Sequence, residues 1–97
     1  MHTYLIAQLN IHDRATYAKY SVAVGDTITR YGGKLLSAEE DAKVVEGEWN
    51  YMRTVLVEFP SEERANAWFQ SAEYQGIVQD RLSASQGNLV FIRGIDA

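Results

Sequence analysis

The chain carries the same order of structural signals twice, and this repetition limits its possible folds more than any other feature. Each half opens with an apolar segment that is typical of a β-strand, at residues 4–11 and 52–59. A short polar residue that can cap a helix follows each segment, Asp13 in the first half and Ser61 in the second. Apolar residues at helical spacing come next, and each half closes on another strand-like segment.

This order predicts the elements βαββαβ in one domain over residues 1–97. In the first predicted helix the apolar stripe ends at the pair Gly32–Gly33, which suits a left-handed helix end. In the second, Ser71 followed by Glu73 predicts a break, with a separate short helix over about residues 73–82. A strand is expected at 34–38, another at 88–94, and a short one (KVVEG) at 43–47 between the halves. The predicted fold class is α+β, a ferredoxin-like antiparallel sheet with helices on one face.

Alternation along the predicted strands divides their side chains between the two faces of the sheet. We place an apolar set against the helices: Leu5, Ala7, Leu9, Ile11, Val55, Val57, Phe59, Val90 and Ile92. The opposite set is mixed: Ile6, Leu56, Leu89 and Phe91 with Gln8, Asn10, Thr54, Glu58 and Arg93. Such a face is more apolar than an exposed one and more polar than a buried one. We therefore expect a homodimer whose sheets close into an α/β barrel around a cavity. A monomer with a half-exposed sheet is the alternative.

Charge and composition exclude several classes of partner. The net charge is −4, and the nine Lys and Arg residues are spread singly, so we expect no nucleic-acid or anionic-membrane partner. Without cysteines the chain has no disulfides or thiol chemistry, and its histidines, His2 and His12, share no metal-ligand spacing. We expect no metal and no cofactor. Since no signal peptide or membrane-spanning run is visible, we expect a cytoplasmic protein.

Several longer segments resemble the family described as domain of unknown function 1330. They are YLIAQLNIHDRATYAKY, VVEGEW and VEFPSEERANAWFQSAEYQGI, and EFPS followed by W-x-x-S-x-E-Y is the most specific combination. The resemblance covers nearly the whole chain, and the residues that match are Tyr17, Tyr20, Gly32, Gly33, Glu46, Gly47, Trp49, Glu58, Phe59, Pro60, Ser61, Trp68, Ser71, Tyr74 and Arg81. It implies a dimeric α/β barrel related in fold to cofactor-free monooxygenases, isomerases, haem-binding barrels and ligand-sensing domains. It implies no particular reaction.

Nine residues are candidates for lining a ligand pocket: Gln8, Asn10, Tyr20, Trp49, Arg53, Glu58, Trp68, Tyr74 and Arg93. Glu58 and Arg93, placed on the same face, suit either a substrate clamp with a nearby base or a structural cross-strand pair. Trp49 and Arg53 border the central turn, where they would close a cavity mouth or stack at the surface.

Aromatic residues on the helices also have two interpretations. For Trp68 we favour core packing with Phe69 over ligand contact, and the break at Ser71 would let Tyr74 reach another part of the fold. His12 beside Asp13 could orient an imidazole, but an exposed turn residue is the simpler interpretation.

Three functions from different classes fit these residues. The first is binding of a small organic ligand. The second is cofactor-independent catalysis on a small aromatic, quinone-like or carbonyl substrate. The third is a dimerisation or assembly module without a ligand. We favour binding over catalysis only because no nucleophile or metal site can be identified.

Overall fold

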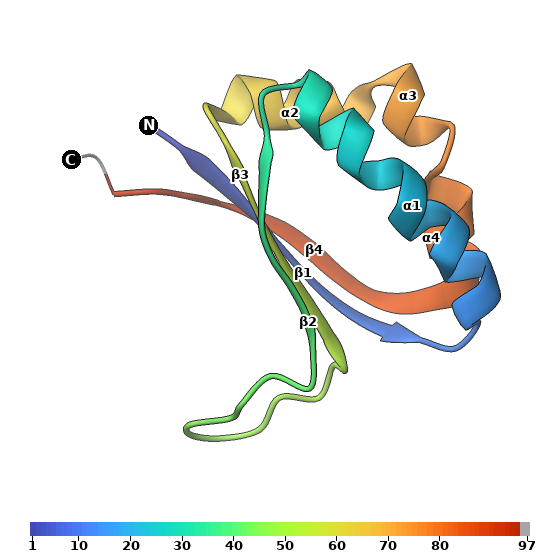
Figure 1. Ribbon diagram of the computed structural model, residues 1–97. Coiled ribbons are helices and arrows are strands. Elements are labelled where there is room, and N and C mark those ends of the chain that lie inside the picture. Colours follow the sequence, from blue (N-terminus) through green and yellow to red (C-terminus); the bar gives the residue numbers. More distant parts are fainter. Residues whose placement is uncertain (96–97) are drawn as a thin grey trace.

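The computed structural model describes residues 1–95 as two layers, an antiparallel sheet and a set of helices that cover one of its faces (Figure 1). In chain order the elements are β1 (Thr3–Ile11), α1 (Arg14–Arg30), β2 (Lys34–Glu40), β3 (Arg53–Phe59), α2 (Glu62–Gln70), α3 (Ala72–Gln75), α4 (Val78–Ala84) and β4 (Ser85–Arg93). The strand order is β2-β3-β1-β4, and every neighbouring pair is antiparallel. This is the ferredoxin-like α+β arrangement that the repeated signals predict.

Side-chain caps set where the helices begin. Asp13 accepts a hydrogen bond from the Thr16 amide at 3.1 Å, and hydrogen bonds from Thr16 lower the pKa of this carboxyl. Ser61 accepts one from the amide of Arg64 at 3.2 Å. The predicted break is confirmed, because the hydroxyl of Ser71 caps α3 by accepting from the Tyr74 amide at 3.1 Å.

Two predictions of secondary structure need correction. The single short helix expected over residues 73–82 is two pieces, α3 and α4, separated at Gly76 and Ile77. The expected KVVEG strand is wrong: residues 41–52 form a loop that extends beyond the sheet (Figure 1). Val45 in this loop is 91% exposed, so the apolar segment has no neighbouring strand to pair with and no core to face.

Aromatic residues form the centre of the core between the two layers. Trp68 and Tyr74 are 1% and 0% exposed, and their ring centroids lie 4.1 Å apart. The Trp68 indole donates a hydrogen bond to the Thr27 hydroxyl at 3.0 Å, so its polar edge is satisfied. Core packing of Trp68 is therefore confirmed. Phe69, expected beside it, is 38% exposed, because adjacent helix positions point in different directions and Trp68 takes the inward one.

The predicted faces of the last strand are reversed. In the observed register Leu89 and Phe91 pair with Ala7 and Leu5, which are buried beneath the helices. Val90 and Ile92 instead pair with Ile6 and Tyr4 on the other face. Both alternating sets of β4 are apolar, so hydropathy alone cannot decide which set faces the helices.

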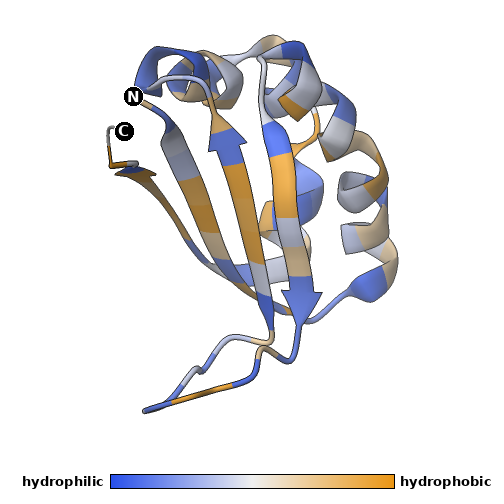
Figure 2. Ribbon diagram, turned by 60° about the vertical axis from the view of Figure 1, so that its left-hand side comes forward, coloured by the Kyte–Doolittle hydropathy of each residue, from blue (hydrophilic) through white to orange (hydrophobic). Residues whose placement is uncertain are grey.

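No helix within residues 1–95 covers the second face of the sheet, which we call the open face. Its apolar residues are Ile6, Leu56, Val90 and Ile92, with Tyr4, Gln8, Thr54, Glu58 and Asn88 around them. Val90 and Ile92 are 49% and 47% exposed. Figure 2 shows the hydrophobic stretches in the middle of the strands and the hydrophilic ones toward their ends.

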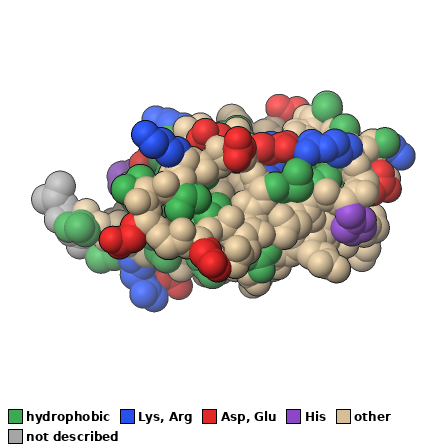
Figure 3. Space-filling view, turned by 90° about the horizontal axis from the view of Figure 1, so that it is seen from below, with side chains coloured by type: hydrophobic (Ala, Val, Ile, Leu, Met, Phe, Trp, Pro, Cys, Tyr) green, Lys and Arg blue, Asp and Glu red, His purple; other side chains and the backbone are tan. Residues whose placement is uncertain are grey.

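The remaining surface is mixed in charge. On the side seen from below, acidic and basic side chains follow one another along an edge and form no basic field (Figure 3). Among residues 1–95, no helix has the length and hydropathy required to cross a membrane.

Candidate functional site

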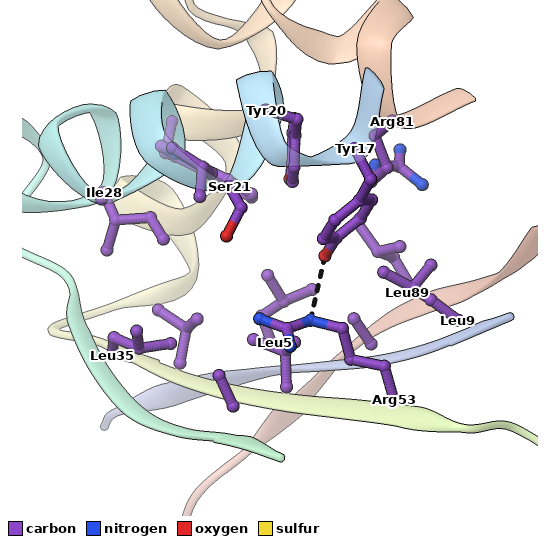
Figure 4. A pocket seen from close by; sticks show the side chains of 17 residues that line it. Leu5, Leu9, Tyr17, Tyr20, Ser21, Ile28, Leu35, Arg53, Arg81 and Leu89 are labelled. Carbon is purple, nitrogen blue, oxygen red and sulfur yellow. Dashed lines mark hydrogen bonds between the residues drawn. The ribbon is translucent and has the colours of Figure 1, made fainter. Parts of the chain in front are cut away.

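A cavity of about 100 Å³ lies between α1 and the helix-covered face of the sheet (Figure 4). Its walls come from every strand and from α1, α2 and α4: Leu5, Ala7, Leu9, Tyr17, Tyr20, Ser21, Val24, Gly25, Ile28, Leu35, Ala38, Arg53, Val55, Val57, Trp68, Arg81 and Leu89. The alternation of the strands explains this lining, since the cavity takes the inward-facing residue at every second position. The cavity is therefore mainly apolar and lies within one protomer.

Polar groups converge on the cavity from the sheet and from α1. Arg53 extends from β3 and donates a hydrogen bond from Nε to the Tyr17 hydroxyl at 3.1 Å (Figure 4). Its guanidinium also lies 5.5 Å from the centre of the Tyr17 ring. The hydroxyl of Ser21, one turn along α1, points into the same space (Figure 4). An otherwise apolar cavity thus has a few fixed groups that can orient a ligand.

A groove of about 240 Å³ adjoins the cavity and shares Tyr17, Ser21 and Arg53 with it. Glu40 on β2 forms part of this groove and lies 3.7 Å from Nη1 of Arg53. Arg14 binds both oxygens of the same carboxylate, at 2.8 and 3.1 Å. The hydrogen bonds from Arg14 lower the pKa of Glu40, which keeps this carboxylate charged beside Arg53.

Arg81 lies in the cavity wall and was given no role by sequence reasoning. It is only 8% exposed, its guanidinium carbon lies 6.0 Å from the centre of the Tyr20 ring, and its Nε has no hydrogen-bond partner within the described chain. A signal was present, because Arg81 follows Val78 by three positions and precedes Ala84 by three. Both neighbours are buried, so a charged residue stands on the buried stripe of α4.

Tyr20 joins the cavity to the aromatic core. Its hydroxyl lies 3.1 Å from that of Tyr74, and either can donate. Burial raises the pKa of Tyr20, so its phenol stays protonated and available as a neutral hydrogen-bonding group.

The structure divides the nine predicted pocket residues between two faces. Tyr20, Arg53 and Trp68 line the cavity, and Tyr74 lies behind Tyr20. The others lie on the open face, in the loop near it or at the edge of the sheet: Gln8, Asn10, Trp49, Glu58 and Arg93. Sequence reasoning placed the pocket between two sheets, whereas the cavity observed here lies under α1.

The predicted pair of Glu58 and Arg93 is wrong, because the two residues lie on opposite faces of the sheet. Arg93 pairs in register with Thr3 and donates to Glu62 on α2 at 3.0 Å. Glu58 accepts a hydrogen bond from the Tyr4 hydroxyl at 3.2 Å. Partial burial and this hydrogen bond raise the pKa of Tyr4.

Trp49 and Arg53, the two candidates near the central turn, also lie on different sides of the sheet. The Trp49 indole donates to the hydroxyl of Thr54 at 2.9 Å, on the open face, while Arg53 turns toward α1. Trp49 and Arg53 therefore do not close one mouth together. The Asn10 side chain holds the loop by accepting from the amide of Met52 at 2.8 Å.

The chemistry that the cavity can support follows from its lining. Within residues 1–95 no three His, Cys, Asp or Glu side chains are grouped as metal ligands. The charged residues in the lining are both arginines. The lining also has three hydroxyl groups, those of Tyr17, Tyr20 and Ser21, which are uncharged and can donate or accept a hydrogen bond. This combination suits binding of an apolar molecule that carries one or more oxygen atoms.

Comparison with known proteins identifies relatives in sequence and in structure. A family model described as a domain of unknown function, DUF1330, matches residues 2–95. No curated protein matches the chain. The crystal structure of RPA0582, a protein of unknown function from Rhodopseudomonas palustris, superimposes with a TM-score of 0.82 at 16% identity, covering 99% of this chain and 84% of that one.

Two further structures share the fold. A dimeric ferredoxin-like protein of unknown function from Jannaschia sp. CCS1 has a TM-score of 0.79 at 10% identity, with 97% of this chain and 100% of that chain covered. SnoaB, a cofactor-independent oxygenase from Streptomyces nogalater, has a TM-score of 0.70 at 5% identity, with 99% and 95% covered. At these identities the similarity establishes the fold and leaves the activity to the site itself.

Proposed function

This chain belongs to the DUF1330 family of domains of unknown function, and from that premise we propose that each protomer binds a small organic molecule in the cavity between α1 and the sheet. The observation that carries the proposal is the cavity itself, an apolar space of about 100 Å³ next to a polar groove. An apolar cavity of about 150 Å³ holds one benzene molecule. At about 100 Å³ this cavity is smaller, so it admits a short branched chain or part of a single ring, with the rest of the ligand in the groove of about 240 Å³.

The polar groups near the groove support an orienting role. Arg53 and the Tyr17 hydroxyl are already held by their mutual hydrogen bond, so little side-chain freedom is lost when a ligand binds. Ser21 adds a hydroxyl that can donate or accept. A carbonyl or hydroxyl oxygen placed between these groups would be recognised by hydrogen bonds, while the apolar walls exclude water.

We also propose a homodimer formed by the open face of the sheet. Its apolar residues, Val90 and Ile92 in particular, are about half exposed in one protomer. A second copy would cover them, as expected for a contiguous apolar surface at the centre of an interface. The dimeric state named for the structurally similar protein from Jannaschia supports this choice of partner.

Cofactor-independent catalysis is the second candidate function. The specific observation in its favour is the shared fold with SnoaB, which is named as a cofactor-independent oxygenase. The arginine and tyrosine groups of the cavity would stabilise negative charge on a substrate oxygen. Turnover of small phenols or carbonyl compounds by the wild-type protein, lost in Arg53→Gln, would support catalysis. Binding without turnover would leave the first proposal standing alone.

The experiment that tests ligand binding combines native mass spectrometry with ligand-detected NMR. Gly25 lines the cavity, and a Cβ built there meets no atom within 4 Å. Gly25→Leu should fill space in the cavity and abolish binding, whereas Gly25→Ala, its matched control, should keep binding. If Gly25→Leu binds the same compounds as wild type, the ligand lies elsewhere and the proposal fails. If no compound binds, an assembly module becomes the better account.

A further inference from the structure

We propose that Arg81 makes the α4 side of this cavity an anion site, which binds the charged oxygen of a small organic acid such as a single-ring carboxylate. The inference rests on the proposed function and specifies the chemical class of its ligand. It begins from the burial of Arg81, which is 8% exposed on α4. A buried charge is costly unless another group pairs with it or hydrogen-bonds to it.

Within residues 1–95, the guanidinium of Arg81 has an unsatisfied donor. Its Nε is buried without a hydrogen-bond partner in the part of the chain that the structure describes. The Tyr20 ring, 6.0 Å from the guanidinium carbon, supports the positive charge by a cation–π contact but accepts no conventional hydrogen bond. A carboxylate in the cavity would pair with the Arg81 guanidinium through charge-assisted hydrogen bonds.

The charges around the cavity also favour an anion. Arg53 and Arg81 are the charged residues of its lining, and both are positive. Arg53 is partly neutralised by Glu40 at 3.7 Å, on the side of the groove. Within residues 1–95, by contrast, no carboxylate lies within ion-pair distance of Arg81. Arg81 is therefore the uncompensated charge of the site.

The backbone around Arg81 is fixed before a ligand arrives. Its backbone carbonyl accepts a hydrogen bond from the buried hydroxyl of Ser85 at 2.6 Å, at the junction between α4 and β4. At the end of the same helix, the backbone carbonyl of Ala84 accepts hydrogen bonds from the amides of His12 and Asp13 at 2.9 and 3.2 Å. The guanidinium that this backbone carries has a planar array of donors, which matches a carboxylate better than a neutral amide.

The test compares benzoate with benzamide, its neutral counterpart of similar shape, by isothermal titration calorimetry. Wild type should bind benzoate at least tenfold more tightly than benzamide. Arg81→Met, which keeps most of the apolar stem, should lose this preference while still binding benzamide. Arg93→Met is the matched control: this arginine is 69% exposed and pairs with Glu62, so the preference for benzoate should persist.

Thermal unfolding separates a binding role from a structural one. If Arg81 serves a ligand, Arg81→Met should unfold at the same temperature as wild type or higher, because a buried unpaired charge is removed. A large loss of stability together with unchanged benzoate preference would overturn the inference. If Arg81→Met fails to fold, the NMR resonance of the Arg81 Nε–H group in wild type is followed during titration instead. A shift with benzoate and not with benzamide supports the anion site, and no shift overturns it.

The outcomes distinguish the two proposals. Equal affinities for benzoate and benzamide in wild type overturn the anion site and leave the cavity as a neutral ligand site. Binding of neither compound overturns the anion site, while the neutral-ligand proposal is decided by the comparison of Gly25→Leu with wild type.

Discussion

The phenol oxygens of Tyr20 and Tyr74 lie 3.1 Å apart in the interior, although the residues are 54 positions apart in the chain. Tyr20 comes from α1 and lines the cavity, whereas Tyr74 comes from α3 and packs on Trp68. The contact depends on the break at Ser71, which turns the chain so that α3 can approach α1. One hydrogen bond therefore links the wall of the candidate site to the aromatic core.

We predict that Tyr20→Phe lowers the free energy of unfolding by about 1–3 kcal/mol, because it leaves the buried hydroxyl of Tyr74 without its partner. Tyr74→Phe should have a similar effect. The double variant should cost less than the two single variants together, since no hydroxyl is then left unpaired. Urea unfolding of the four proteins measures this coupling, and simple additivity would show that the hydrogen bond contributes nothing.

Gly25→Ala should raise the free energy of unfolding by about 0.5–1 kcal/mol, because glycine in the middle of a helix is less favourable than alanine. The added Cβ meets no atom within 4 Å, so nothing opposes this gain. Gly33→Ala is the contrasting variant, since its Cβ would lie 2.6 Å from Cγ2 of Ile28 and 2.7 Å from Cε1 of Phe59. It should destabilise. Thermal melts of both variants should shift in opposite directions, and a common direction would contradict the packing described around α1.

Acid should weaken the protein partly through Glu40. Hydrogen bonds from Arg14 hold the folded-state pKa of this carboxyl below its ordinary value of 4.5. A lowered folded-state pKa means that its contribution to stability is present above about pH 4.5 and is lost as the pH falls through the folded value. Glu40→Gln should therefore flatten the decline in stability below pH 4.5. Unfolding curves collected from pH 3 to pH 7 test this. If the variant loses stability below pH 4.5 as steeply as wild type, the prediction is contradicted.

Ile92→Glu should convert the proposed homodimer to a monomer, because it places a charge within the apolar part of the open face. Ile95→Glu is the control, since Ile95 is 99% exposed and lies beyond the end of β4. Light scattering at micromolar concentration provides the measurement. A monomeric wild type, or an Ile92→Glu dimer, would count against the open face as the interface.

The order of the elements could be predicted from the sequence because the residues that start the helices act locally. Asp13, Ser61 and Ser71 act as caps wherever the rest of the chain lies, since each bonds to an amide three positions away. Trp68 could likewise be assigned to the core, as its size and its place on the helix stripe suggest. These features do not depend on contacts between distant parts of the chain.

The face of each β4 side chain could not be predicted in the same way. Alternation shows that Leu89 and Phe91 share a face, but the register with β1 decides which face it is. Val90 and Ile92 are as apolar as Leu89 and Phe91, so hydropathy did not indicate which pair faces the helices. The misplaced pair of Glu58 and Arg93 followed directly from this ambiguity. The expected pocket between two sheets stays a prediction, because it requires a second copy of the chain.

Arg81 was missed for a related reason. A lone arginine in a short helix ordinarily reaches solvent, and its burial depends on how α4 packs against α1. The sequence pattern places it on the same stripe as Val78 and Ala84, which in retrospect is the stronger indication. Tyr17 was named only among the residues that match the family, and Ser21 was given no role, since their contribution to a cavity depends on the distance between α1 and the sheet.

The central claim is that a small molecule binds under α1 and not on the open face, and methyl NMR tests it most directly. With Ile, Leu and Val methyl groups labelled, titration with a single-ring ligand should shift the resonances of Leu5, Val24 and Ile28, which lie in or beside the cavity. The resonances of Ile6, Val90 and Ile92 on the open face should stay unchanged. Shifts confined to the open-face methyl groups, or no shifts at all, would contradict the account.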